Sequence, residues 1–347
     1  MSDTLIKVRD LAVSFQTEDG VVRAVDGVSF DLHKGEVLAI VGESGSGKSV
    51  SVMTLMGLTR SPNASFGGEA VLSAEWGEDM ELIGAADNQL RRVRGAEIAM
   101  IFQDPMTSMN PVQRVGDQIV EQIRVHQDLT DAEAHGRAVE MLDRVGIPRA
   151  AERARHYPHE FSGGMRQRAM IAMAFSCDPR VLIADEPTTA LDVTVQAQIL
   201  EQIKTMREEA EAGVILVTHD LGVVADIADR IAVMYAGRIV EHGTVDEVFY
   251  DPQHPYTWGL LGSITRVDRP RPKRLPAIAG LPPSLDRPPE GCHFRPRCPH
   301  AFDACGQTPA LEHRGGASPE HTDRCFLDPE AKRAKRVVNG QFGLEAA

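Results

Sequence analysis

The feature that most constrains this chain is a glycine-rich stretch of eight residues. An apolar run from Val37 to Val41 precedes it and an apolar-rich segment from Val50 to Leu58 follows, which predicts a strand, a loop and a helix. Three glycines let the backbone curl tightly and aim its N–H groups at phosphate oxygens. The pattern is typical of a phosphate-binding loop, made of Gly42, Glu43, Ser44, Gly45, Ser46, Gly47, Lys48 and Ser49.

Two side chains of this loop have predicted roles. Lys48 is expected to reach the β- and γ-phosphates of a nucleotide, and the Ser49 hydroxyl is expected to bind Mg²⁺. The following helix adds the positive end of its dipole. The alternative is a glycine-rich turn without nucleotide, but the strand before it and the helix after it favour the nucleotide site.

Length and composition indicate a globular protein. A chain of 347 residues accommodates one large α/β domain and a smaller unit, and its 42% hydrophobic and 25% charged residues are ordinary. No stretch approaches the ~20 apolar residues of a membrane helix, and the first 15 residues do not resemble a secretory signal. We therefore expect a cytoplasmic chain.

Charge is unevenly distributed. The net charge of −13 disfavours general nucleic-acid binding. Residues 1–252 contain 23 basic and 40 acidic side chains, whereas residues 253–347 contain 14 and 10. The second part also holds 13 of the 21 prolines and four of the five cysteines. These shifts predict a domain over residues 1–252 and a C-terminal extension over residues 253–347.

The pattern before the loop predicts a small antiparallel β layer. The segment from Leu5 to Phe15 alternates as a strand does, and Asp19-Gly20 is a strong hairpin turn. Phe15 either stacks on an adenine ring or packs in the core.

A helical insertion is predicted between two core strands. Apolar runs over 98–102 and 181–184 predict the strands, and helices are expected over 112–127, 131–145 and 164–177. The helical subdomain therefore spans about 103–177. A further strand at 214–218 and a hairpin over 231–240 complete the sheet.

Four polar residues directly follow predicted strands, where ligands bind in open α/β sheets. Asp185 fits the carboxylate of a magnesium site, and Glu186 fits a general base that activates water. Gln103 is expected to orient that water or bind the metal, and His219 to contact the γ-phosphate. Singly, a strand-end histidine or an acidic pair is often structural, but their order around a phosphate loop favours catalysis.

Further motifs resemble those of ABC-type ATPases. The stretch from Phe161 to Arg168 (FSGGMRQR) resembles the family signature, with Phe161 and Met165 departing from its commonest form. Asp185-Glu186-Pro187-Thr188 resembles the second nucleotide motif, and Ala190-Leu191-Asp192 resembles the D-loop. The resemblance implies a P-loop ATPase with a RecA-like core, an antiparallel β subdomain and a helical subdomain.

The resemblance also implies a partner ATPase. Ser162, Gly163 and Gly164 would form a second anion site at a helix start and face the γ-phosphate bound by another subunit, with Asp192 at the same interface. The chain has one phosphate loop, so the second ATPase must come from another chain, a related one by preference. ATP binding would close the pair and hydrolysis would let it open.

Within this family the chain is similar to the ATP-binding subunits of dipeptide, oligopeptide and nickel importers, over residues 3–328. The similarity rests on 102–111 (FQDPMTSMNP), 254–257 (HPYT) and 280–299. It implies a peripheral subunit on the cytoplasmic face of the membrane, two permease partners and an external binding protein. Met106 and Met109 would contact the permeases or pack in the core, and the cargo is unreadable from this chain.

Other classes fit less well. A nucleic-acid-directed ABC ATPase usually has a coiled-coil insertion or two ATPase units, an exporter is usually fused to membrane spans, and a kinase or GTPase leaves the signature without a role.

The extension contains four cysteines in proline-rich sequence. Disulfides are disfavoured in a reducing cytoplasm, and the spacing of the four cysteines does not match usual zinc sites. Four thiolates can hold an iron–sulfur cluster, and some related importers are thought to carry [4Fe–4S] there. We expect this cluster, with zinc or no metal as alternatives, at Cys292, Cys298, Cys305 and Cys325. Cys177 follows an apolar helix and is expected to be a core thiol.

Overall fold

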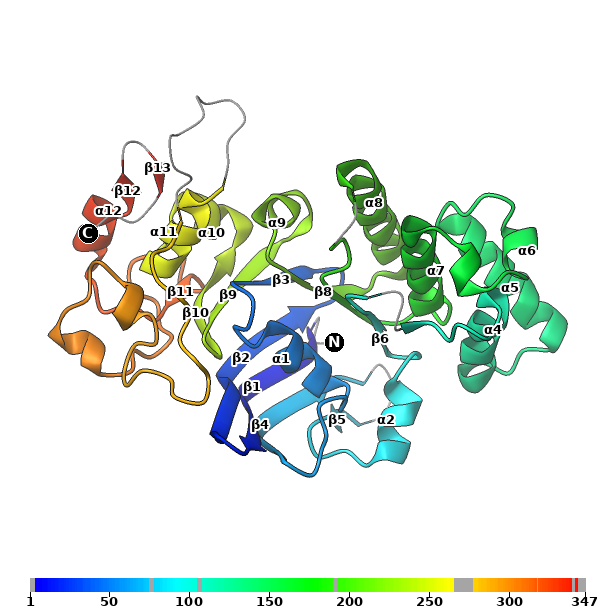
Figure 1. Ribbon diagram of the computed structural model, residues 1–347, viewed down its shortest axis with the longest axis horizontal. Helices are drawn as coiled ribbons and strands as arrows, with labels where there is room; N and C mark the ends of the chain where they lie inside the picture. The colour runs from blue at the N-terminus through cyan, green and yellow to red at the C-terminus, as the bar shows by residue number, and fades with distance from the viewer. Residues whose placement is uncertain are drawn as a thin grey trace. The chain divides into compact units, whose positions relative to one another are not determined.

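A computed structural model describes residues 4–74, 78–104, 108–189, 192–264, 277–316, 318–338 and 341–342. Clustering of Cα positions divides the chain into two compact units. The first unit comprises Met1–Ile6, Asp31–Val37 and Val71–Val217, and the second comprises Lys7–Phe30, Leu38–Ala70 and Thr218–Ala347. Each is described by itself below, and Figure 1 labels their elements.

The first unit is built on three parallel strands in the order β8-β7-β6. β6 (Ile98–Ile101) pairs with β7 (Val181–Asp185), which pairs with β8 (Gly213–Thr218). All residues of these strands are buried, as expected for parallel strands covered on both faces. Because the carboxyl ends of β6 and β7 lie at the same edge, the residues that follow them lie close together.

Between β6 and β7 the chain forms a group of helices, drawn in green and cyan-green in Figure 1. The predicted helical insertion is therefore confirmed. Thr130 caps α5 by accepting a hydrogen bond from the Glu133 N–H, and Glu133 returns one to the Thr130 N–H. The helices and 3-10 turn are α4 (Val115–His126), α5 (Asp131–Arg144), α6 (Ala150–Arg153), η1 (Pro158–Glu160) and α7 (Gly163–Phe175).

Met109 is buried in this unit, as its core alternative predicts, and Cys177 is buried, as expected of a core thiol. Met106 lies outside the described residues. The remaining elements of the unit are β5 (Met80–Glu81), α2 (Asp87–Val93) and α8 (Val193–Ala210). Helix α2 was not expected from the sequence, because only two of its seven residues, Leu90 and Val93, are apolar, which is too few to establish a helical period.

The second unit holds the strand order β11-β10-β9-β3. β3 (Val37–Val41) is parallel to β9 (Arg230–Tyr235), which forms the predicted antiparallel hairpin with β10 (Arg238–Thr244). A second sheet has the order β2-β1-β4 within this unit, from β2 (Gly20–His33), β1 (Thr4–Thr17) and β4 (Ala64–Leu72). The β layer predicted before the glycine-rich loop is thus present.

The helices and remaining short elements of the second unit all begin at or after Lys48 in the sequence. They are α1 (Lys48–Leu55), α9 (Leu221–Ile227), α10 (Val245–Tyr250), α11 (Pro255–Gly262), η2 (Arg295–Arg297), η3 (Asp303–Gly306), β11 (Thr322–Asp323), α12 (Pro329–Lys335), β12 (Val337–Val338) and β13 (Gln341–Phe342). No helix among the described residues is long and apolar enough to cross a membrane.

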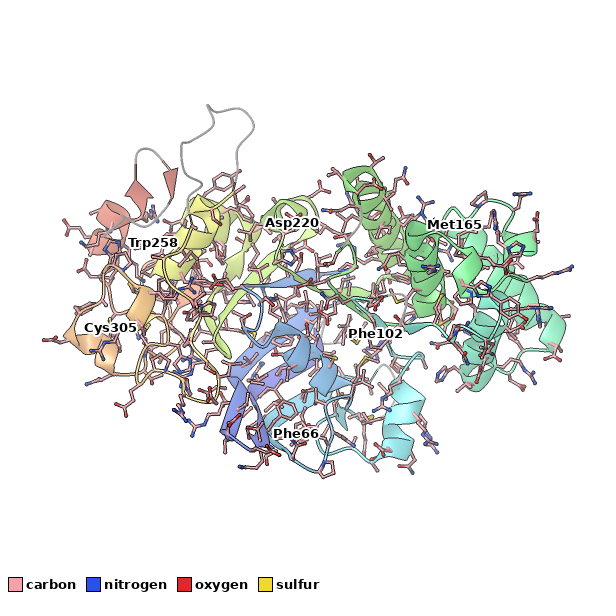
Figure 2. All side chains as sticks on the ribbon, viewed as in Figure 1. Phe66, Phe102, Met165, Asp220, Trp258 and Cys305 are labelled. Carbon is pink, nitrogen blue, oxygen red and sulfur yellow. The ribbon has the colours of Figure 1, made fainter. Side chains whose placement is uncertain are left out.

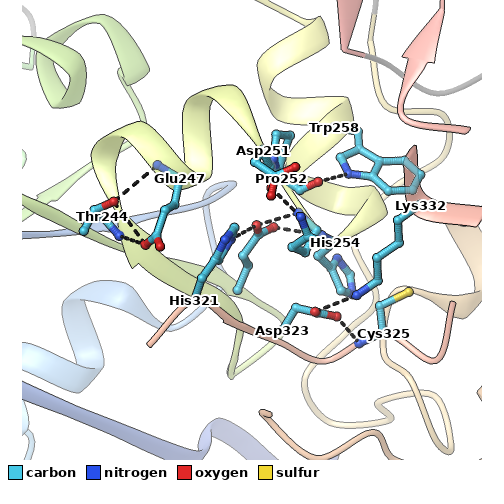
Figure 3. Close-up of polar contacts among 12 residues, drawn as sticks. Thr244, Glu247, Asp251, Pro252, His254, Trp258, His321, Asp323, Cys325 and Lys332 are labelled. Carbon is cyan, nitrogen blue, oxygen red and sulfur yellow. Dashed lines mark hydrogen bonds and ion pairs between the residues drawn. The ribbon is translucent and has the colours of Figure 1, made fainter. Parts of the chain in front are cut away.

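The extension joins the sheet through β11, which pairs with β10 with Glu241 opposite Asp323. The Glu241 side chain is fully buried, and two of the residues that bind it, His254 and His321, are labelled in Figure 3. Its carboxylate accepts hydrogen bonds from the Gln253 N–H (2.6 Å), the His254 N–H (2.9 Å) and His321 Nε2 (2.9 Å). A buried carboxylate is tolerated only with such partners, so Glu241 ties the start of the extension to β11. The predicted boundary near residue 252 stays a prediction.

A second buried pair closes the extension. Lys332 on α12 donates to Asp323 at 2.6 Å, and both side chains are fully buried (Figure 3). Asp323 also accepts from the Cys325 N–H at 2.8 Å. Burial raises the pKa of the Asp323 carboxyl to about 6, although Lys332 opposes the shift. The carboxylate therefore depends on the lysine for its charged state.

The Lys332→Met variant tests this dependence. It leaves Asp323 buried without a cation and should lower the free energy of unfolding by about 3–5 kcal/mol at pH 8. The cost should shrink at pH 5, because a carboxyl with a raised pKa takes up a proton and its destabilising charge disappears as the pH falls. Denaturant unfolding at the two pH values measures both effects.

The control is Lys335→Met on the same helix, where the lysine is exposed. Its stability should stay within about 0.5 kcal/mol of the wild type. Equal losses for the two variants, or a Lys332→Met cost that grows at pH 5, would contradict the assignment.

Candidate functional site

The phosphate loop lies in the second unit, between β3 and α1. Gly42, Gly45 and Gly47 all have positive φ, at 154°, 77° and 100°. A Cβ at Gly42 would lie 2.1 Å from the Met234 carbonyl oxygen, and one at Gly47 would lie 2.2 Å from the Ala24 carbonyl oxygen. The loop therefore packs against the backbone of β9 and β2, where only glycine fits.

Lys48 starts α1, and its side chain is 5% exposed. Its Nζ donates to the Gly42 carbonyl at 2.9 Å and to the Glu43 carbonyl at 3.0 Å. The ammonium thus binds the carbonyls of the first two residues of the loop. Ser49 follows on the first turn of the helix, and Ser44 and Gly45 are exposed at the tip.

Glu43 has two partners that the sequence did not reveal. Its N–H donates to the Tyr256 hydroxyl at 2.8 Å, and its carboxylate pairs with Arg297 at 2.5 and 3.0 Å. Tyr256 lies in the 254–257 motif that was noted only as a family feature. Arg297 gave no signal, because nothing in the sequence links it to a residue 254 positions earlier.

In the first unit the structure brings Gln103 and Glu186 together. Gln103 follows β6 and donates its Nε2 hydrogen to the Glu186 carboxylate at 3.1 Å. Thr189 donates its hydroxyl hydrogen to the same carboxylate oxygen at 2.8 Å. Glu186 has φ of 46°, a region that costs a non-glycine residue energy, and its N–H donates to the Val217 carbonyl. These contacts give the carboxylate a fixed direction at the end of the sheet.

Asp185, the last residue of β7, is 4% exposed. The backbone two residues after Asp185 is held by Gln167 on α7, which is 2% exposed and donates to the Pro187 carbonyl at 2.6 Å. Gln167 was not expected as part of the site, since it is one of several polar residues in the signature stretch. A buried carboxylate at a strand end has the oxygen chemistry that Mg²⁺ prefers.

The signature residues form a capped helix start in the first unit. The Ser162 hydroxyl accepts from the Met165 N–H at 3.3 Å, and Ser162 and Gly163 are exposed (Met165 is labelled in Figure 2). A Cβ at Gly164 would lie 3.1 Å from the Val195 side chain of α8. Exposed amides at the start of a 13-residue helix are suited to an anion.

Asp192 caps the neighbouring helix α8 by accepting from the Thr194 and Val195 N–H groups at 3.1 and 3.0 Å. Residues 190 and 191 of the predicted D-loop lie outside the described residues. In the second unit His219 is exposed and follows β8, and Phe15 is half-buried on β1. Both roles expected for Phe15, stacking on an adenine ring and packing in the core, stay predictions.

The iron–sulfur prediction is wrong. The four cysteines of the extension line one small cavity, with Cys305 and Cys325 buried. The described residues, all four cysteines among them, nevertheless contain no group of three His, Cys, Asp or Glu side chains placed to hold a metal ion, zinc included. Burial raises the pKa of the Cys298 thiol to about 12 and raises those of Cys292 and Cys325. These thiols are therefore protonated, and Cys292 and Cys298 pack against the apolar core.

Two family models match the sequence. One, described as "ABC transporter", matches residues 25–189, and one, described as "Oligopeptide/dipeptide transporter, C-terminal region", matches residues 240–305.

Curated relatives match over most of their length. The oligopeptide transport ATP-binding protein OppD of Salmonella typhimurium is 50% identical over 329 residues, which are 95% of each chain. The dipeptide transport ATP-binding protein DppD of Bacillus subtilis is 50% identical over 337 residues, 97% of this chain and 98% of the relative.

Solved structures share the fold. The dimeric structure of MJ0796, described as a bacterial ABC transporter cassette, has a TM-score of 0.61 at 26% identity and covers 69% of this chain and 98% of its own. The cbiO1 structure from Clostridium perfringens, part of the ABC transporter complex cbiONQ, has a TM-score of 0.59 at 28% identity, with 72% and 92% coverage. The α/β fold expected from the sequence is confirmed.

A pair of alanine substitutions tests the loop geometry. Gly45→Ala meets no atom within 4 Å and should cost about 1–2 kcal/mol of unfolding free energy from its positive φ alone. Gly42→Ala adds the clash with the Met234 carbonyl and should cost more. Denaturant unfolding without nucleotide compares the two, and a Gly42→Ala variant as stable as Gly45→Ala would show that the loop does not pack on β9 this closely.

Proposed function

Since this chain belongs to the ABC transporter family, we propose that it powers the import of peptides across a membrane by binding and hydrolysing ATP. It is an ABC-type ATPase, which uses ATP and Mg²⁺. The observation that carries the peptide assignment is the 50% identity to oligopeptide and dipeptide transport proteins, which extends over both the ATPase region and the extension.

The phosphate loop would bind the ATP phosphates. Its three glycines have positive φ, and Lys48 Nζ lies 2.9–3.0 Å from two carbonyl oxygens of the loop. Ser49, Asp185 and Gln103 carry the oxygen groups that suit Mg²⁺ and are proposed as its ligands, and the bound ion would offset phosphate charge.

Glu186 would act as general base by taking a proton from the attacking water. The hydrogen bonds from Gln103 and Thr189 fix its carboxylate, which removes the need to order it during reaction. His219 would donate a hydrogen bond to the γ-phosphate. These roles follow from strand-end positions and from the family order of the motifs.

A second ATPase subunit would complete the site. Ser162 and Gly163 are exposed at the start of α7, so this anion site is available to a phosphate held by another chain. The MJ0796 relative is itself described as dimeric. We propose that two such subunits close on ATP, with Asp192 at the same interface, and that their opening is transmitted to two membrane permeases.

In this proposed assembly the chain would lie on the cytoplasmic face of the membrane, where ATP is available. Peptide would reach the permeases from an external binding protein. The second ATPase is proposed to be a related chain.

The Glu186→Gln variant tests the chemistry. Removal of the base should lower kcat for ATP hydrolysis by about 10²-fold or more, while the Kd for ATP stays within about threefold. The matched control Glu69→Gln changes an exposed carboxylate on β4 and should leave both values unchanged. Hydrolysis by Glu186→Gln at near the wild-type rate would remove Glu186 from the mechanism.

Transport itself is tested in liposomes. The chain is purified with its co-isolated permeases and second ATPase, and uptake of labelled di- and oligopeptides is followed with the external binding protein present. We expect ATP-dependent uptake that a Lys48→Ala complex loses. A chain that co-purifies with no permease would contradict the proposed partners. A complex that hydrolyses ATP without moving peptide would contradict the proposed cargo.

A further inference from the structure

Glu43 lies inside the phosphate loop and is held at three points. Its N–H donates to the Tyr256 hydroxyl at 2.8 Å, and its carbonyl accepts from Lys48 at 3.0 Å. Its carboxylate accepts two hydrogen bonds from the guanidinium of Arg297, at 2.5 and 3.0 Å. Two of the three contacts come from the extension, which follows the loop by more than 200 residues.

Arg297 is placed rigidly for this contact. Its side chain is 5% exposed, against 28% for Glu43. Its Nε donates to the Ala279 carbonyl at 2.9 Å, and its remaining hydrogens reach the Ile278 carbonyl and the Tyr235 hydroxyl, each at 3.4 Å. All five N–H donors are thus engaged, and a planar fork with fixed partners holds a carboxylate in one orientation.

Tyr256 is placed as firmly. It is fully buried on α11, with its ring 4.6 Å from Tyr235 and 5.5 Å from Phe294. His254 caps that helix by accepting from the Tyr256 N–H, and Pro255 occupies its first turn. The 254–257 motif therefore has a physical task, which is to aim a hydroxyl at the backbone of the phosphate loop.

The negative charge of Glu43 would oppose ATP binding if no cation neutralised it. Glu43 is an anion in a loop that binds a polyanion, and an unpaired carboxylate there would repel the phosphates and compete for Lys48. Arg297 cancels that charge with two charge-assisted hydrogen bonds. The Tyr256 hydroxyl accepts from the Glu43 N–H and so fixes the direction of this amide, which is the first after Gly42.

We propose that the C-terminal extension positions the phosphate loop for ATP, through Arg297, which neutralises and orients Glu43, and Tyr256, which fixes its backbone. Both are positioning residues, since neither is placed to touch the nucleotide. The inference rests on the proposed function, in which the loop binds ATP. By linkage, ATP in the loop stabilises the docked extension to the same degree.

The test uses the full chain with Mg²⁺ and measures the Kd for ATP by displacement of a fluorescent ATP analogue. Arg297→Gln should weaken ATP binding about tenfold, and Arg297→Lys should weaken it less, since it keeps the charge but loses the fork. Tyr256→Phe removes only the acceptor and should weaken binding about threefold. Arg295→Gln, two residues away and exposed, is the matched control and should bind as the wild type does.

A charge rescue separates this role from simple packing. In the Arg297→Gln background, Glu43→Gln removes the unpaired carboxylate and should restore much of the lost affinity. In the assembled complex, Arg297→Gln should raise KM for ATP while kcat changes less than about threefold, because the reacting groups are untouched.

Wild-type affinity in Arg297→Gln, or equal weakness with and without Glu43→Gln, would overturn the inference. If Arg297→Gln fails to fold, Arg297→Lys and Tyr256→Phe carry the test, and wild-type affinity in both would overturn it. A wild-type chain that binds no ATP would instead overturn the proposed function. These failures are therefore distinguishable.

Discussion

The close approach of the phosphate loop to neighbouring backbone is the constraint on which the second unit depends. Two glycines lie where a Cβ would meet a carbonyl oxygen at 2.1–2.2 Å, one against β9 and one against β2. The Gly237 N–H also donates to the Ser46 carbonyl at 2.9 Å, so the turn of the β9–β10 hairpin supports the loop. The loop is thus held in place by β9, β2 and the hairpin turn, and these contacts set the position of Lys48.

The extension is part of this same support. Its strand β11 continues the sheet from β10, and the buried Glu241 and Asp323 anchor it through hydrogen-bonded and charged partners. Breaking one member of such a pair is costly, because it leaves a charge without solvent or a partner. The anchor therefore holds α11 and η2 firmly enough for Tyr256 and Arg297 to act on the loop.

Local patterns predicted much of the molecule. The glycine-rich loop, the buried strands β6, β7 and β8, and the helices between β6 and β7 all follow from apolar periodicity and turn residues, and the structure confirms them. Contacts between distant segments could not be predicted this way. Arg297 and Glu43 meet because β10, β11 and the rings of Tyr235, Tyr256 and Phe294 pack together in the fold. Gln167 and Pro187, which lie 20 residues apart, likewise meet only in the folded chain.

The cysteine prediction failed for a related reason. The number of cysteines in a short proline-rich segment suggested four ligands for one cluster, and the four thiols do line one cavity, but not as a group placed to hold a metal ion among the described residues. Whether thiols act as ligands depends on their orientation and charge, and burial raises the pKa of the Cys292, Cys298 and Cys325 thiols, which favours their protonated form. Sequence proximity carries no information about either property.

The left-handed backbone of Glu186 has a consequence for anyone who alters this protein. Its φ of 46° is cheap for glycine and costly for other residues, so a search for thermostable variants would favour glycine there. That change would remove the carboxylate held by Gln103 and Thr189. In the proposed function Glu186 is the general base, so selection for heat resistance alone would remove the base, and position 186 should be excluded from stability libraries.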